Sequence, residues 1–436
     1  MSGCVQWKRQ EAAVIANDFR FTEWFTPVLS YDIWKIGWVL KYSGWVPHEF
    51  GRKTLDGQVA IYTSLFAANK IKPFLDWMIT RDGSLLYVAI ITAIAIVCNE
   101  AKISCKNMKG ENVDWYSAIK LPASADETYK GRSFVYIDPS ETNWLTSRRP
   151  IDDPLSAIGS TVQQLYDTKK ETTLKITYND KCFDREGDSG RAHSKGVVVF
   201  DNETGFWLIH SVPNFPPKKK KYTYPESGVK YAQSFLCVSL SLDALRNITT
   251  YMRIAKVTPC YYNVPKFHRK FDPYLVDVTK KHRYKGANAT IMEIRTVQNK
   301  PFKLFVKSKK FAKDIWQDLI ATYYGADFFV ETWLNGGATD VETKCNNRRK
   351  VYNVEEVKLL STKFSSSLDH SKWGVSATKN INVVCVGDVN RQESQFKRGG
   401  GAACTVDDKL TKTFNNSVAS YIGCSIKNKK IEIKKY

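Results

Sequence analysis

Hydrophobic positions along the chain repeat with two periods. Short apolar runs bounded by Gly, Asp and Asn are typical of β-strands, and three stand out, at 134–137 (FVYI), 196–200 (GVVVF) and 206–210 (FWLIH). Two longer segments, 151–167 and 310–323, have apolar residues at helical spacing. Because both periods occur in one region, the pattern predicts a mixed α/β protein.

The N-terminal hundred residues follow a different pattern. Residues 85–97 (LLYVAIITAIAIV) form an apolar run that is short for a bilayer span, with Arg81 before it and small or polar residues after it. We interpret 78–101 as a signal peptide, with a signal anchor as the alternative. Residues 1–77 are then a Trp-rich N-terminal extension of unknown role. An artefact of gene prediction, which we favour, a cytosolic segment or a small extra domain would each explain it.

Cysteines and glycosylation signals agree with entry into the secretory pathway. An even number of cysteines follows the leader, which suits disulfide bonds in an oxidising compartment. These eight are Cys105, Cys182, Cys237, Cys260, Cys345, Cys385, Cys404 and Cys424. Four Asn-x-Ser/Thr sequons lie in the same region, at Asn202, Asn247, Asn288 and Asn415. No CxxC pair or His/Cys cluster offers a zinc site, so we expect no metal and no cofactor.

The chain is strongly basic. It has 65 Lys and Arg residues against 44 Asp and Glu residues, a formal net charge of +21. Such a surplus attracts polyanions, chiefly nucleic acid or anionic membrane, although a generally basic surface without a specific partner is the alternative. The one dense run, 218–221, follows Pro216 and Pro217 and is typical of an exposed loop. It contacts DNA only if it borders the active site.

One tripeptide occurs twice. His193-Ser194-Lys195 precedes Asn214 by 19 residues, counted from the lysine, and His370-Ser371-Lys372 precedes Asn390 by 18. Each copy leads into strand-type residues. The repeat predicts two related half-domains, 102–300 and 301–436, that meet at a pseudo-two-fold axis around one active site.

Paired His and Lys side chains suit phosphodiester hydrolysis. Residues i and i+2 of an extended strand face the same side, so each histidine projects together with its lysine, away from the serine between them. The lysines can neutralise phosphate oxygens in place of a metal. One neutral imidazole can attack phosphorus while the other, protonated, donates to the leaving oxygen, which favours an acidic working pH. Asn214 and Asn390 can donate hydrogen bonds to the phosphate. Which histidine is the nucleophile stays open.

Other interpretations of these residues are weaker. A single His-x-Lys usually marks an exposed strand edge. A serine hydrolase would need GxSxG around Ser194 or Ser371, and neither serine has it. Asp369 is beside His370 in the sequence, but as its neighbour in a strand it would point away.

The sequence resembles deoxyribonuclease II, the acid nuclease of lysosomes. The resemblance extends through most of 105–424 and is densest in six blocks. They are VDWYSAIKLP at 113–122, GRAHSKGVVVFDNETGFWLIHSVPNFPP at 190–217, FLCVSL at 235–240, DHSKWGVS at 369–376, CVGDVNR at 385–391 and KRGGGAAC at 397–404.

The resemblance implies a fold and an activity. The expected fold is α/β, a pseudo-dimeric phospholipase D-like arrangement of two half-domains with mixed β-sheets flanked by helices. The implied activity is metal-independent cleavage of DNA that leaves 3′-phosphate and 5′-hydroxyl ends. His193 with Lys195, and His370 with Lys372, match the family's catalytic pairs. The resemblance also implies lysosomal or secreted localisation, without stable membrane association once the leader is removed.

The resemblance further implies three disulfides, Cys105–Cys237, Cys345–Cys424 and Cys385–Cys404. Cys182 and Cys260 are left over, and a fourth bridge between them is our own hypothesis. The wider phospholipase D-like pattern has an Asp where this chain has Phe200 and Ala377, so what orients each imidazole is unassigned. Gly374 stands where mammalian relatives have Cys, a change that we expect to be tolerated.

Two other classes of function are compatible with the sequence. One is a catalytically inactive relative that binds nucleic acid or glycan, which the two intact HSK motifs argue against. The other is a phospholipase D-like lipid phosphodiesterase, which the basic charge disfavours and an apolar, Trp-lined mouth of the site would favour. We expect lysosomal or apoptotic DNA degradation as the role. Oligomeric state and strand preference are not predicted.

Overall fold

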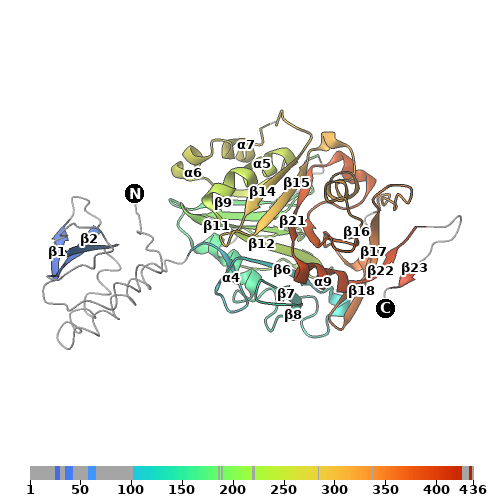
Figure 1. The fold of residues 1–436 in the computed structure, drawn as a ribbon, viewed down its shortest axis with the longest axis horizontal. Helices are drawn as coiled ribbons and strands as arrows, with labels where there is room; N and C mark the ends of the chain where they lie inside the picture. Colours follow the sequence, from blue (N-terminus) through green and yellow to red (C-terminus); the bar gives the residue numbers. More distant parts are fainter. Residues whose placement is uncertain are drawn as a thin grey trace. The chain divides into compact units, whose positions relative to one another are not determined.

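The structure is a computed structural model whose fold is shown in Figure 1. It describes residues 102–424 apart from 185, 186, 188, 189, 219, 220, 283 and 336, and strand backbone at 25–29, 35–42, 57–64 and 432–434. The chain divides into two compact units, Met1–Lys102 and Ile103–Tyr436. The leader predicted at 78–101 lies outside the described residues. Within the first unit three strands pair antiparallel in the order β1 (Phe25–Leu29), β2 (Lys35–Tyr42) and β3 (Gly57–Ser64).

The second unit contains an eight-stranded sheet in the order β13-β9-β10-β11-β12-β6-β7-β8. All its strand pairs are antiparallel. The strands are β6 (Trp115–Lys120), β7 (Phe134–Ile137), β8 (Leu145–Thr146), β9 (Leu174–Tyr178), β10 (Gly196–Phe200), β11 (Thr204–His210), β12 (Gln233–Ser241) and β13 (Pro259–Asn263). The three strands predicted from apolar runs are confirmed as β7, β10 and β11, and β11 starts two residues early.

A ten-stranded sheet follows in the order β14-β15-β21-β20-β19-β16-β17-β22-β23, with β18 also paired to β17. Among its described strands only β16 and β17 pair in parallel. The strands are β14 (Ala289–Arg295), β15 (Pro301–Lys307), β16 (Phe328–Glu331), β17 (Val351–Leu359), β18 (Thr362–Ser365), β19 (Trp373–Ser376), β20 (Val383–Gly387), β21 (Gly400–Val406), β22 (Val418–Ile422) and β23 (Glu432–Lys434). β14 therefore joins this sheet before residue 301, where the second half-domain was predicted to begin.

The two sheets share a run of strands. β9-β10-β11-β12 in the first sheet and β16-β19-β20-β21 in the second have the same order and the same antiparallel directions. Hydrogen bonds repeat at matching places: His210 N to Lys195 O (3.2 Å) with Gly387 N to Lys372 O (2.8 Å), and Ser211 N to Ser234 O (3.1 Å) with Asp388 N to Gly401 O (3.0 Å). Each HSK motif therefore ends at the start of an equivalent strand.

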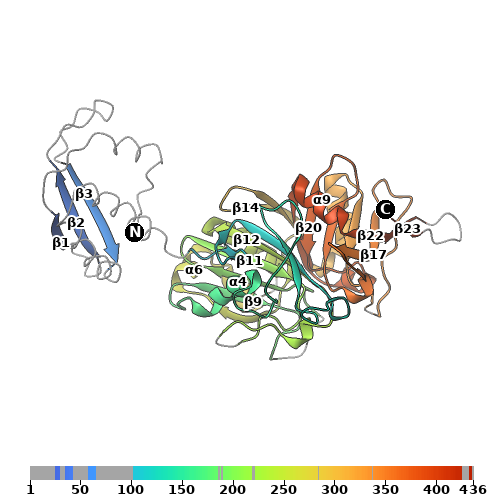
Figure 2. The ribbon, with the colours of Figure 1, turned by 90° about the horizontal axis from the view of Figure 1, so that it is seen from below.

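Helices lie on the faces of both sheets (Figures 1 and 2). The longest are α4 (Ala157–Asp167), α5 (Leu245–Ala255) and α9 (Asp408–Asn416). The others are α6 (Lys266–Phe271), α7 (Leu275–Thr279), α8 (Thr322–Tyr324), the π-helix η6 (Trp316–Ala321) and the 3-10 turns η2 (Ala123–Ala125), η3 (Glu226–Gly228), η4 (Leu242–Ala244), η5 (Lys309–Phe311), η7 (Ser366–Leu368) and η8 (Glu393–Lys397). None of the helices in the described part of the chain has the length and apolar character needed to span a bilayer.

Both predicted helices are shorter than expected. The helix predicted at 151–167 begins at Ala157, because Ser156 caps it by accepting a hydrogen bond from Gly159 N at 3.0 Å. The segment predicted as one helix at 310–323 is divided into η5, η6 and α8.

The apolar core has three parts. One cluster contains residues of both sheets together with α5 and α9, including Trp207, Trp373 and Phe414. A second lies between α4 and the opposite face of the first sheet, and a third lies between η6 and the second sheet. Alternate strand residues thus face different clusters, as buried sheets covered on both faces require.

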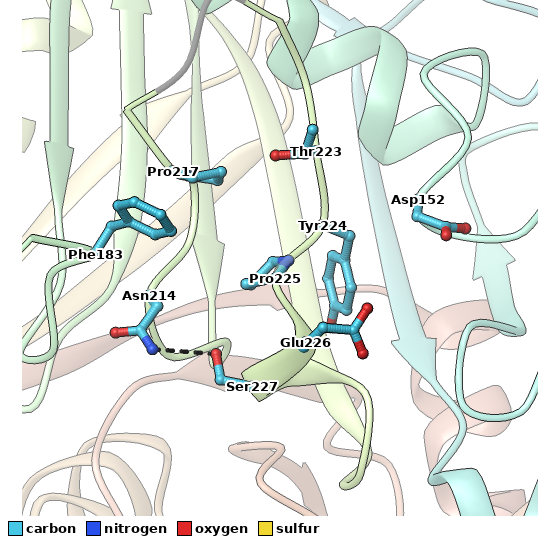
Figure 3. Close-up of a pocket in the computed structure, with 9 residues that line it drawn as sticks. All are labelled: Asp152, Phe183, Asn214, Pro217, Thr223, Tyr224, Pro225, Glu226 and Ser227. Carbon is cyan, nitrogen blue, oxygen red and sulfur yellow. Dashed lines mark hydrogen bonds between the residues drawn. The ribbon is translucent and has the colours of Figure 1, made fainter.

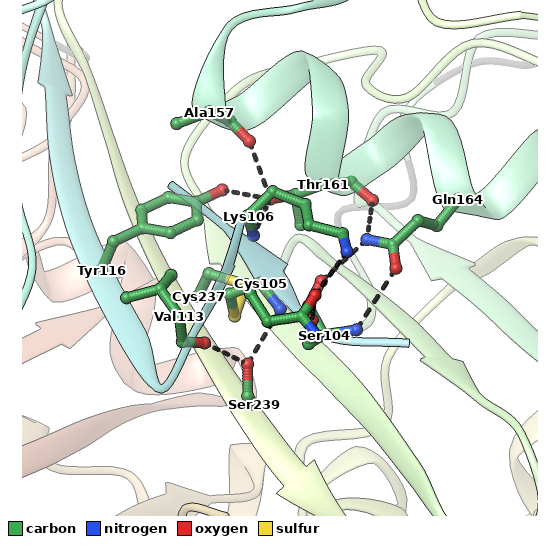
Figure 4. The surroundings of a disulfide bond; sticks show 11 residues. Ser104, Cys105, Lys106, Val113, Tyr116, Ala157, Thr161, Gln164, Cys237 and Ser239 are labelled. Atoms are coloured by element: carbon green, nitrogen blue, oxygen red, sulfur yellow. Dashed lines mark hydrogen bonds between the residues drawn. A yellow bond between two sulfur atoms is a disulfide. The ribbon is translucent and has the colours of Figure 1, made fainter. Parts of the chain in front are cut away.

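All eight cysteines that follow the predicted leader form disulfides. The pairs are Cys105–Cys237, Cys182–Cys260, Cys345–Cys424 and Cys385–Cys404, which are the pairs expected from the sequence. Figure 4 shows the first, which joins β4 (Cys105–Lys106), paired with β5 (Asn112–Val113), to β12. There Ser239 Oγ accepts from Cys105 N at 2.8 Å and donates to Val113 O at 2.6 Å.

Candidate active site

The two HSK motifs lie where the halves of the second unit contact each other. His193 N donates to Gly399 O at 3.0 Å, and Gly399 immediately precedes β21 of the second sheet. In return His370 N donates to Ala232 O at 3.0 Å, just before β12 of the first sheet. Both motifs are extended but precede strands β10 and β19 rather than lying within them. Each motif is therefore held by the opposite half.

The first pair is fixed by residues of both halves. His193 Nδ1 lies 2.8 Å from the backbone oxygen of Asp388. Because a carbonyl only accepts, Nδ1 holds a proton and the Nε2 edge is left for chemistry. That edge faces a carboxylate: Asp180 Oδ2 lies 3.6 Å from His193 Nε2, and Asp180 Oδ1 lies 2.5 Å from Lys195 Nζ.

The second pair lies among aromatic side chains. The His370 ring stacks on Tyr231, with centroids 4.5 Å apart and planes at 10°, and its other neighbour is Trp333 at 3.9 Å. Lys372 Nζ donates to His370 O at 2.5 Å, and Lys372 N donates to Ser234 Oγ at 3.1 Å. Backbone and ring contacts thus orient this pair.

Buried positive charge disfavours protonation of both imidazoles. Burial, and then the Lys195 ammonium, lower the pKa of His193 well below its usual value. Burial and the ammonium groups of Lys372 and Lys195 lower the pKa of His370 to about 2. Burial and Lys195 also lower the pKa of Lys372 to about 7. The two pairs therefore share one electrostatic environment, which a bound anion would neutralise.

Three buried carboxyls differ in charge. Burial would raise the pKa of Asp180, but the nearby cations, chiefly the Lys195 ammonium and also the Arg398 guanidinium, hold it well below its usual range. Burial raises the pKa of Asp388 and of Asp369 to about 6, although both accept backbone hydrogen bonds. Asp369 Oδ1 accepts from Ser371 N at 2.7 Å, which agrees with the expectation that it points away from its histidine neighbour. Among the described residues, no group of three or more His, Cys, Asp or Glu side chains could hold a metal ion.

Comparison with known proteins identifies the family. The profile of the family described as Deoxyribonuclease II matches residues 104–424. The chain belongs to the deoxyribonuclease II family. It is 38% identical over 342 residues to Cell-death-related nuclease 7 of Caenorhabditis elegans, covering 78% of this chain and 93% of that protein. It is 31% identical to Plancitoxin-1 of Acanthaster planci (78% and 98% covered) and 30% identical to Deoxyribonuclease-2-beta of Homo sapiens (75% and 93% covered).

The side chains of Asn214 and Asn390 have hydrogen-bond partners outside the His–Lys pairs of this deoxyribonuclease II family member. Asn214 lines a pocket of about 650 Å³, where its side-chain amide is 3.2 Å from Ser227 Oγ (Figure 3). Asn390 is buried, and its Nδ2 donates to Gln392 Oε1 at 3.4 Å. In the described part of the chain no hydrogen bond joins either amide to a histidine or lysine of the two HSK motifs. Their predicted contact with phosphate stays a prediction.

The predicted glycosylation sites of this family member differ in exposure. Asn202 and Asn288 are exposed. Asn247 and Asn415 are half-buried, and their amides donate to Glu293 O at 2.8 Å and Ser376 O at 3.2 Å. Glycans are therefore accommodated best at the first two.

Sequence reasoning missed three polar residues of the site. Asp388 and Arg398 lie inside blocks that resemble deoxyribonuclease II, CVGDVNR and KRGGGAAC, so the blocks themselves could have drawn attention to them. Asp180 lies in no motif. Its importance depends on contacts with Lys195 and Arg398 that only the folded chain creates.

Proposed function

We propose that this protein is an acid endodeoxyribonuclease that hydrolyses DNA phosphodiester bonds without a metal ion. The single observation that most supports this is that each HSK motif is hydrogen-bonded to the opposite half, through His193 N to Gly399 O and His370 N to Ala232 O, both at 3.0 Å. Such an arrangement is expected when both His–Lys pairs contact one phosphate. The matching strand orders of the two sheets support a pseudo-symmetric, phospholipase D-like arrangement of two halves. The name Cell-death-related nuclease favours a role in apoptotic DNA degradation, and lysosomal DNA degradation is the alternative role that we propose.

The proposed reaction has two steps. The two lysines neutralise the non-bridging oxygens of the phosphate, and one imidazole attacks phosphorus to form a phosphohistidine. The bond to the 5′-oxygen breaks, and the second histidine, as an imidazolium, donates its proton to that oxygen. The same histidine, now neutral, then takes a proton from water, which attacks the phosphohistidine. The products are a 3′-phosphate and a 5′-hydroxyl.

An acidic working pH follows from the site. The proton donor must be charged, yet burial and neighbouring lysines lower the pKa of His193 and of His370. Acid and a bound phosphate anion both favour the imidazolium. We therefore expect the rate to fall as pH rises towards neutrality, because the fraction of enzyme that holds the donor proton falls.

Plasmid cleavage tests this proposal. The secreted protein is assayed at acidic pH with EDTA, alongside His193→Ala, His370→Ala and the control His282→Ala, whose side chain is exposed. We expect the control to cleave normally and each of the other two to lose at least about 100-fold in rate. End analysis should find 3′-phosphates. A folded wild-type protein that leaves DNA intact would contradict the proposal, and DNA binding without cleavage would instead identify an inactive binding relative.

A lipid phosphodiesterase is a second candidate function. The observation that favours it is the aromatic surround of His370, formed by Tyr231 and Trp333, both half-buried. A dispersed short-chain phosphatidylcholine, assayed under the same conditions, distinguishes the two. Turnover of this lipid with DNA left intact would select the lipid activity.

A further inference from the structure

We propose that Asp180 is a positioning residue of this active site, whose carboxylate holds Lys195 and the Nε2 edge of His193 and limits how tightly the site binds phosphate. This inference rests on the proposed function and concerns a residue in no motif. Asp180 contacts two cations, Lys195 Nζ at 2.5 Å and Arg398 Nη2 at 3.2 Å. Its Oδ2 also lies 3.6 Å from His193 Nε2, a pair that attracts when the imidazole is protonated.

The carboxylate occupies a place suited to an anion. Lysine and arginine cations converge on it, as they would on the oxygens of a phosphate. Its side chain is only 15% exposed, like that of His193. Asp180 therefore competes with substrate phosphate for the Lys195 charge while keeping the ammonium in place.

Neighbouring contacts fix the backbone around Asp180. Asn179 Nδ2 donates to Val212 O at 3.0 Å and to Phe215 O at 3.1 Å. On the other side, Cys182 is joined to Cys260 by a disulfide. Because Asn179 and Cys182 hold the backbone on either side of it, the carboxylate is a fixed part of the site.

Arg398 extends this contact across the two halves. It belongs to the segment before β21, and besides Asp180 it donates to Arg191 O at 3.2 Å and Ala192 O at 3.0 Å. Through Arg398, the Asp180 carboxylate and the residues just before His193 are thus connected to the second half. Loss of its charge should disturb the placement of the first His–Lys pair.

Two opposite kinetic effects are expected from Asp180→Asn, which keeps the size but removes the charge. Phosphate should bind more tightly, because Lys195 loses its counter-ion. Turnover should fall, because Lys195 and His193 are no longer held.

The groups that face His193 are Lys195 and Asp180 of its own half and Lys372, Arg398 and Asp388 of the other. Asp180 raises the pKa of His193 against the other cations, so its removal should shift the corresponding limb of the pH–rate profile to lower pH.

The experiment compares wild type, Asp180→Asn, Asp180→Glu and the control Asp277→Asn. Asp277 also contacts an arginine and a histidine, Arg253 at 2.7 Å and His282 at 3.1 Å, but lies on α7. Each protein is tested for kcat and KM on an oligonucleotide across pH, for inorganic phosphate affinity by calorimetry, and for thermal stability. For Asp180→Asn we expect about a tenfold lower kcat, a lower KM and about threefold tighter phosphate binding. Asp180→Glu should restore the phosphate affinity of wild type.

Two results would overturn the proposal. One is Asp180→Asn behaving like Asp277→Asn in kcat, KM and phosphate affinity. The other is loss of activity with reduced stability while phosphate affinity and the pH profile stay unchanged, which indicates a merely structural role. If Asp180→Asn does not fold, Asp180→Glu decides the matter, since unchanged kcat and KM there contradict a role that depends on carboxylate position. An inactive wild type would contradict the proposed function, while the phosphate measurements would still test Asp180.

Discussion

At the scale of single residues, Asp388 has two separate functions in the structure. Its backbone oxygen contacts His193 Nδ1 and so selects which ring nitrogen faces the site. Its buried carboxyl accepts from Gly401 N at 2.7 Å and from Tyr251 Oη at 2.8 Å. Because Asp388 orients the His193 ring through its main chain, its side chain can change protonation without losing that contact.

Asp388→Asn should change how stability depends on pH. Burial raises the pKa of Asp388 to about 6, above its value of about 4 in an unfolded chain. The native state thus binds the extra proton, so this stabilisation is fully present below pH ~4 and is lost as pH rises through about 6, by at most about 3 kcal/mol. We expect the Tm of wild type to fall relative to that of the variant between pH 4 and 7. A Tm difference between wild type and Asp388→Asn that stays constant between pH 4 and 7 would contradict the assigned protonation.

At the scale of elements, the segment 179–182 connects the disulfide framework to the site. It follows β9, is tied to β13 through Cys182–Cys260, and contains Asp180. The Cys345–Cys424 bridge closes nearly the same sequence separation, 79 residues against 78, elsewhere in the chain. Comparing the two bridges therefore distinguishes an effect on overall stability, which both should have, from support of the site, which only Cys182–Cys260 should provide.

Replacing each bridge by an alanine pair should lower Tm similarly, because the chain entropy restored to the unfolded state depends on loop length. The loss in each case should be about 2–5 kcal/mol. Only Cys182→Ala with Cys260→Ala should also lower kcat at a temperature where both variants are folded. Melting curves and initial rates measure the two effects. Equal kcat in the two double variants would show that this bridge does not support Asp180.

Sequence patterns predicted the elements best where local interactions determine them. The apolar runs that became β7 and β10 have the predicted bounds, because alternate faces of these strands lie in different parts of the core. The helix predicted at 310–323 is divided, since apolar periodicity does not encode the turns between η5, η6 and α8. The HSK motifs were predicted as strand but precede the strands, because their backbone groups bond across the halves.

At the scale of the whole molecule, the repeated HSK tripeptide could be predicted from the sequence. The residues that contact each copy of it could not. A duplicated tripeptide is visible in sequence, so the convergence of two His–Lys pairs follows from assuming a pseudo-symmetric fold. Asp180 and Arg398 are 218 residues apart, and no spacing rule connects them. The two halves also differ: a carboxylate faces His193, whereas aromatic rings face His370. Such asymmetry comes from tertiary contacts and gives the two histidines unequal environments.

The net charge of +21 predicts salt-sensitive attack on DNA, and the structure indicates where part of that sensitivity arises. Lys218 and Lys221 are exposed, and Pro217, next to Lys218, lines the pocket that contains Asn214 (Figure 3). A hydrogen bond from Asn214 N to Lys181 O at 3.0 Å joins this pocket to the Asp180 segment. We therefore predict that DNA bound at the site contacts these lysines.

Lys218→Glu with Lys221→Glu should therefore flatten the slope of log kcat/KM against log salt by about 2. The control, Lys409→Glu with Lys412→Glu on α9, changes net charge equally and should leave the slope nearly unchanged, because neither lysine lines the pocket. Both slopes are measured by plasmid cleavage at salt concentrations from about 20 to about 200 mM, the range in which counterion release dominates. Equal flattening by both pairs would mean that the field of the whole molecule, rather than contact at the 218–221 loop, attracts the DNA.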